Sequence, residues 1–150
     1  MGALFEQLAG ETNLRVARQQ ADSPIRLPAY PAGLGEPQRV FVQDADGAMV
    51  VLIWLDPARP DHARLSLHLI EEGSWALYKM QPQIVQETLV RGHRAIWAVG
   101  PYPLILRTRD VAVVRLIDGH MLIWIVDGIT YRVETDLPLE EAVRVADSMH

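Results

Sequence analysis

The clearest pattern of apolar and polar positions lies in the last third of the chain. From Ile129 to Glu134, apolar and polar residues alternate, which is typical of a strand with one buried face. The apolar run Met121–Val126 has the length of a strand that is covered on both faces. Asp127-Gly128 between them favours a two-residue hairpin turn, because both turn positions need a positive φ. Since Asp118-Gly119 repeats this signal, residues 111–135 are predicted to form a three-stranded antiparallel meander.

The two-residue turn also fixes the register of its hairpin, with Trp124 opposite Tyr131. Six apolar side chains then share one face of the sheet: Leu122, Trp124, Val126, Ile129, Tyr131 and Val133. A helix at about residues 138–148 is predicted to cover this face, because Pro138 and two glutamates suit a helix start. Its apolar residues recur at helical spacing. They are Leu139, Ala142, Val143, Ala146 and Met149.

The upstream chain predicts mainly strands. A short helix is expected from Thr12 to Gln20, followed by an extended connection over Ser23–Pro37, which holds four prolines and two glycines. Seven further strands are predicted: Arg39–Asp44, Met49–Leu55, Leu65–Leu69, Trp75–Met80, Ile84–Val90, Ala95–Val99 and Leu104–Arg107. The fold class is therefore α+β, a large curved antiparallel sheet of about eight to ten strands with an N-terminal and a C-terminal helix.

Composition narrows the possible partners. The 150 residues suit one domain. The formal net charge of −5 argues against binding to nucleic acid or to anionic lipid. The absence of cysteine excludes thiol catalysis, cysteine-ligated zinc and disulfides. No apolar run approaches the roughly 20 residues of a spanning helix, and Met1–Glu6 lacks the features of a signal peptide. By itself, this pattern indicates a soluble cytoplasmic protein.

The closing string LIWIVDGITYRVETDLPLEEAVRVADSM resembles the end of a domain of unknown function found in bacterial membrane-anchored, anti-sigma-factor-like proteins. The upstream segments ADSPIRLPAYPAGLGEPQRVFV and VRGHRAIWAVGPYPLIL are similar to that domain too, so the resemblance covers most of residues 12–149. It implies a single α+β domain over residues 12–150, preceded by a cloning or linker remnant over residues 1–11. It also implies a non-enzymatic sensor or interaction domain on the extracytoplasmic face of the membrane, held there by an anchor absent from this chain.

No metal site is predicted. The five histidines have no helical metal-binding spacing, and His68 falls on the polar side of its strand. They are His62, His68, His93, His120 and His150. Asp44-Ala-Asp-Gly47 has acidic residues spaced as in a calcium-binding loop. However, Val42 and Ile53 occupy positions where such a loop needs ligands. The segment is better explained as a hairpin turn.

No catalytic or cofactor-binding residue is predicted, so the chain is not expected to be an enzyme. Ser74 lacks the second glycine of a nucleophile elbow, and Ser148 falls at a helix end, where a hydroxyl usually bonds to the backbone. The adjacent acids Glu71-Glu72 and Glu140-Glu141 are interpreted as solvated surface. No glycine-rich phosphate loop is present.

Tryptophans leave a second function open. All four lie in predicted strands: Trp54, Trp75, Trp97 and Trp124. Tryptophans in a sheet usually belong to its core, but a curved sheet could also gather them in a concave apolar pocket. The alternative function is therefore a soluble carrier that holds a lipid or other apolar ligand against the sheet. The expected partner is a protein or a small apolar molecule, and the pattern fixes no oligomeric state.

Overall fold

The computed structural model describes residues 10–44, 48–71, 79–80, 84–99, 102–108, 111–117 and 119–149. These ranges contain two helices, α1 (Leu14–Gln20) and α2 (Leu139–Asp147). Their strands are β1 (Glu11–Thr12), β2 (Arg39–Asp44), β3 (Ala48–Asp56), β4 (Arg59–Ile70), β5 (Lys79–Met80), β6 (Ile84–Val90), β7 (His93–Val99), β8 (Tyr102–Thr108), β9 (Val111–Ile117), β10 (His120–Val126) and β11 (Ile129–Thr135). No helix among the described residues is long and apolar enough to cross a membrane.

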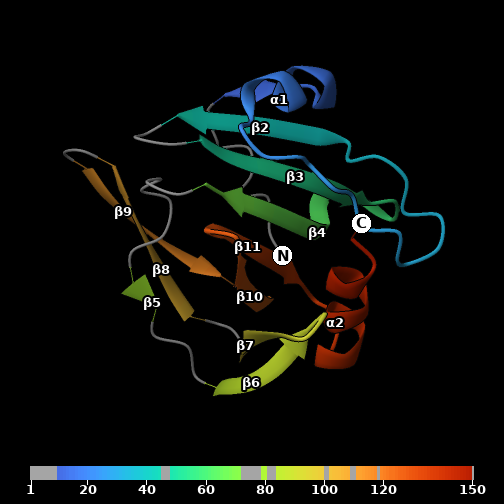
Figure 1. The fold of residues 1–150 in the computed structure, drawn as a ribbon, viewed down its shortest axis with the longest axis vertical. Helices are drawn as coiled ribbons and strands as arrows, with labels where there is room; N and C mark the ends of the chain where they lie inside the picture. Colours follow the sequence, from blue (N-terminus) through green and yellow to red (C-terminus); the bar gives the residue numbers. More distant parts are fainter. Residues whose placement is uncertain are drawn as a thin grey trace.

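Eight strands form one antiparallel sheet in the order β1-β2-β3-β4-β11-β10-β7-β6. In Figure 1 this sheet extends from β2 at the top to β6 at the bottom, with α1 above β2 and α2 beside the lower strands. The predicted α+β fold, mostly antiparallel sheet with a helix near each end, is confirmed. The strands are nevertheless divided between two sheets, because β5, β8 and β9 pair separately in the order β5-β8-β9.

The predicted hairpin of β10 and β11 is confirmed with its register. Trp124 lies opposite Tyr131, and the turn residues Asp127 and Gly128 have φ angles of 52° and 80°. The first strand of the predicted meander is present as β9, but its predicted pairing with β10 is wrong. β10 has β7 as its second neighbour, with Leu122 opposite Trp97, whereas β9 pairs with β8. The Asp118-Gly119 signal is local and does not determine which strand lies beside β10. The pairing with β7 brings Leu122 and Trp97 together in the main core.

One face of the eight-stranded sheet carries this main core. Leu52, Leu67, Leu122 and Val133 are fully buried there. The predicted C-terminal helix is confirmed as α2, which covers part of the face with Ala142, Val145 and Ala146, and Met149 just after the helix packs beside them. Val145, absent from the predicted apolar stripe, is completely buried, whereas Leu139 and Val143 are only partly buried.

The extended connection between α1 and β2, residues 21–38, lies against α2. The Ser148 hydroxyl accepts hydrogen bonds from the backbone N–H groups of Ala29 (2.9 Å) and Tyr30 (3.1 Å) and donates one to the carbonyl of Val145 (2.7 Å). The Tyr30 hydroxyl donates to Glu141, and the Arg144 guanidinium lies 4.2 Å from the centroid of the Tyr30 ring. Ser148 thus bonds to the backbone as predicted, and in doing so joins two distant parts of the chain.

The start of the described chain belongs to the sheet. Glu11, inside the predicted linker remnant, pairs with Phe41 of β2, and its carboxylate forms an ion pair with Arg39. The Gly10 carbonyl accepts a hydrogen bond of 2.9 Å from the N–H of Val42. Residues 1–9 lie outside the described residues.

Candidate functional site

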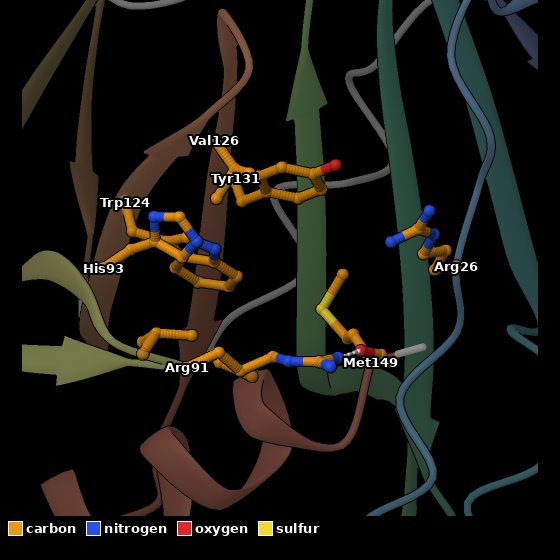
Figure 2. A pocket seen from close by; sticks show the side chains of 9 residues that line it. Arg26, Arg91, His93, Trp124, Val126, Tyr131 and Met149 are labelled. Atoms are coloured by element: carbon orange, nitrogen blue, oxygen red, sulfur yellow. Dashed lines mark hydrogen bonds between the residues drawn. The ribbon is translucent and has the colours of Figure 1, made fainter.

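A pocket of about 340 Å³ opens between α2, the extended connection and the β10–β11 hairpin. Figure 2 shows its lining side chains, which come from segments far apart in the sequence. They are Arg26, Val90, Arg91, His93, Trp124, Val126, Tyr131, Ala146 and Met149. The volume lies at the small end of the range of small-molecule sites, about 300–1,000 Å³.

The aromatic wall of the pocket follows from the hairpin register. Because Trp124 and Tyr131 are directly opposite residues, their rings stack with centroids 5.4 Å apart and an interplanar angle of 11°. Trp124 is 5% exposed, and Tyr131 and Val126 are half-buried. The hairpin therefore supplies both core packing and an apolar surface for a ligand.

The opposite side of the pocket is formed where α2 meets the turn between β6 and β7. Arg91 and Gly92 occupy this turn with φ angles of 48° and 83°, as a two-residue hairpin loop requires. The Arg91 N–H donates to the Asp147 carboxylate over 2.9 Å, and its guanidinium donates to the Met149 carbonyl. These bonds tie the turn to the end of α2, so Ala146 and Met149 hold a defined position beside Val90.

Charge around the pocket is mainly positive. Arg26, Arg91 and His93 line it, and none of the described lining residues is an aspartate or a glutamate. Burial raises the pKa of the Tyr131 phenol, the nearby Arg26 guanidinium lowers it, and the Asp127 carboxylate raises it further, with a net upward shift. Since an unperturbed phenol already has a pKa of about 10, Tyr131 is protonated at neutral pH and can donate a hydrogen bond.

Of the four tryptophans, Trp124 alone lines this pocket, as seen in the part of the chain that the structure describes. Trp54, Trp97 and Trp124 are 1%, 4% and 5% exposed, so all three belong to the core. The Trp54 ring N–H is satisfied by the carbonyl of Gly35 at 3.0 Å. Trp75 lies outside the described residues.

A second cluster, the polar quartet Ser66, His68, Arg132 and Glu134, lies on the other face of the sheet. Strand pairing places Arg132 opposite His68 and Glu134 opposite Ser66. All four are buried, with exposed fractions from 2% to 8%. The sequence places His68 on the polar side of its strand, which predicts a solvated side chain. The structure shows instead that His68 is buried. Phe41, Val51 and Ile53 pack on the same face and make the environment of the quartet largely apolar.

The quartet has the wrong hydrogen-bond direction for a serine nucleophile. Arg132 Nη2 lies 3.1 Å from His68 Nδ1 and can only donate, because a guanidinium has no acceptor. A neutral His68 therefore carries its proton on Nε2, which lies 2.7 Å from Ser66 Oγ and donates to it. The ring consequently cannot take the proton of that hydroxyl. Arg132 Nε also lies 3.1 Å from Glu134 Oε1. The quartet is therefore centred on a buried ion pair, and His68 contacts the arginine of that pair.

The other candidate residues are dispersed. His62 pairs with Asp61 at 2.9 Å, and the His120 ring lies 5.2 Å from that of Trp97. Among the described residues, no group of three histidine or acidic side chains could hold a metal ion. Residues 45–47, Glu72, Ser74 and His150 lie outside the described ranges.

The prediction for Glu71 as solvated surface is wrong. Glu71 is 9% exposed, and its carboxylate accepts hydrogen bonds from the N–H groups of Asp22 (2.8 Å) and Ser23 (3.3 Å). It satisfies backbone donors at the point where the chain leaves α1, a use that a pair of adjacent acids in the sequence does not reveal. Glu140 is exposed, whereas Glu141 is half-buried beside Tyr30.

Comparison of the chain with protein-family models, with curated proteins and with solved structures found no match. The site is therefore defined by its geometry. Sequence reasoning missed Arg26 and Arg91 and considered His93 only as a metal ligand, because each lies in a connection or at a strand end with no periodic signal.

Proposed function

We propose that this chain is a non-enzymatic sensor domain that binds a small molecule in the pocket beside Trp124 and Tyr131. The observation that carries the proposal is the combination of a stacked aromatic pair, apolar side chains and convergent polar groups around one cavity. Small-molecule sites usually have this composition. The hydrogen-bond direction in the polar quartet supports a function without a serine nucleophile.

The proposed setting is the extracytoplasmic face of a bacterial membrane, with an anchor outside this chain. The resemblance of residues 12–149 to domains of anti-sigma-factor-like proteins supports it. In such a setting, a ligand that touches α2 and the extended connection together would stabilise their contact, which is held by Ser148 and Tyr30. Ligand occupancy would then be communicated to the rest of the protein through these segments.

The alternative is a soluble carrier that holds a lipid or other apolar ligand in the concave face of the sheet. The apolar side chains of Trp124, Val126 and Met149 favour it. The volume of about 340 Å³ favours the sensor, because sites that bury whole ligands extend to about 1,000 Å³ and a membrane lipid needs the upper part of that range.

Native mass spectrometry of the protein purified from its own host tests binding directly. The proposal expects one small molecule per chain, released on denaturation. In cell fractionation the protein should sediment with membranes, and protease added outside the cell should cleave it. A bound diacyl lipid on a freely soluble protein would favour the carrier. A ligand-free protein from every fraction would contradict both functions.

A further inference from the structure

The lining of the pocket separates charge from apolar surface. Trp124, Val126 and Met149 form an apolar part of the lining. The polar side chains of the lining are Arg26, Arg91, His93 and Tyr131. Among the described lining residues there is no carboxylate beside the Arg26 guanidinium. Asp147 and Asp127 lie nearby, but Asp147 accepts from the Arg91 backbone and Asp127 belongs to the exposed hairpin turn. The pocket therefore complements a ligand with an apolar body and a negative group.

Arg26 is the side chain best placed for that negative group. It projects from the extended connection, and Figure 2 shows its guanidinium directed across the cavity toward Trp124 and Tyr131. No residue in the described ranges forms an ion pair with it. Its charge acts on the Tyr131 phenol in the direction of a lower pKa, although the effect of burial is larger and the net shift of that pKa is upward. A guanidinium binds a carboxylate with two parallel hydrogen bonds, which gives orientation as well as affinity.

Tyr131 provides a second donor on the same side. Its hydroxyl makes no hydrogen bond to the part of the chain that the structure describes, and in Figure 2 it points toward the side of the cavity that holds Arg26. Arg91 is held in place by its bond to the Met149 carbonyl and adds positive potential from the opposite wall. A planar ligand body would fit between the Trp124 ring and the Met149 side chain, where aromatic and thioether contacts are favourable.

We propose that this pocket binds a small organic carboxylate with an aromatic or short acyl body, the carboxylate held by Arg26 and Tyr131 and the body held by Trp124, Val126 and Met149. This inference rests on the proposed small-molecule function and names the class of its ligand. It differs from the apolar ligand expected from the sequence, because the cationic side chains become part of the site only in the folded chain.

Isothermal titration calorimetry with a matched pair of probes tests the inference. 1-Naphthoate and 1-naphthalenemethanol have the same ring system, but only the first carries a carboxylate. The expected result is that naphthoate binds at least tenfold more tightly. Arg26→Gln should weaken naphthoate binding about tenfold, the usual effect of losing a charge-assisted hydrogen bond, and should leave binding of the alcohol unchanged.

Arg18→Gln is the control, because Arg18, like Arg26, is an exposed arginine but lies on α1 outside the pocket. It removes the same formal charge and should change neither affinity. Equal affinities for the two probes, or equal losses in Arg26→Gln and Arg18→Gln, would overturn the carboxylate assignment. Absence of binding by both probes would overturn it too. The proposed sensor function is judged separately, by the presence of a ligand on protein from the host.

Discussion

Arg132 and Glu134 are two charged residues in a nearly solvent-free environment. Arg132 is 2% exposed and Glu134 is 8% exposed, with Nε and Oε1 3.1 Å apart. Arg132 Nη1 finds no hydrogen-bond partner within the described residues. A sequence in which Arg132 and Glu134 alternate with apolar residues predicts a solvated face, because periodicity separates two faces but does not show whether the second is covered.

Breaking this ion pair from one side should be costly. Arg132→Met is expected to lower the free energy of unfolding by about 3–5 kcal/mol, since it leaves the Glu134 carboxylate buried without its partner. The double variant Arg132→Met/Glu134→Leu should recover most of the loss, because it removes both charges. Urea denaturation of the two variants provides the measurement. A single variant as stable as the wild type would show that the pair is solvated.

Trp124 should be a main stabilising residue despite its place at the pocket. Its side chain is 5% exposed and stacks on Tyr131, so Trp124→Ala is expected to cost about 3–5 kcal/mol. Ile125→Ala is the control, because the next residue of the same strand is 61% exposed and should change stability by less than about 0.5 kcal/mol. If both variants show the same urea midpoint, this face is not the core.

At the scale of elements, α2 and the extended connection act as one unit. The helical spacing of apolar residues was sufficient to predict α2, and the two-residue turn was sufficient to predict the β10–β11 register. The docking of residues 21–38 on α2 could not be predicted, because it depends on the hydroxyls of Ser148 and Tyr30 and on backbone N–H groups. These groups have no periodicity, and a proline-rich segment gives no signal of where it lies.

Truncation after Asp136 tests this unit. A helix of this length is marginal in water by itself, so α2 exists because it docks, and its loss would expose Leu122 and Val133 and free the extended connection. The truncated chain should be insoluble or bind hydrophobic dyes strongly. A monomeric product that unfolds cooperatively and binds no dye would show that α2 is a detachable segment rather than part of the core.

At the scale of the whole molecule, the sequence predicted the positions of the strands better than it predicted which strands pair with each other. The hairpins β2–β3, β6–β7 and β10–β11 join consecutive strands, whereas β4 pairs with β11 and β7 pairs with β10. These two long-range pairings decide which segments surround Trp124. The aromatic part of the pocket was therefore accessible to sequence reasoning, while its cationic part required the sheet order and the position of the extended connection.

The domain should fold and remain folded without a metal ion. The chain has no cysteine, and the described histidine and acidic side chains form no group of three that could bind a metal. Elemental analysis should show less than stoichiometric zinc, and a chelator should leave the thermal midpoint unchanged. Stoichiometric zinc with a large loss of thermal stability in chelator would contradict this expectation.

The central claim, that the pocket beside Trp124 and Tyr131 is the ligand site, is tested most directly by amide and indole NMR. Small molecules extracted from the host are titrated into isotope-labelled protein. We expect the largest shift changes at the Trp124 indole N–H and at the amides of Val126, Tyr131 and Met149. Changes confined to the other face of the sheet, around the exposed Ile96 and Ile125, or no changes at all, would contradict the claim.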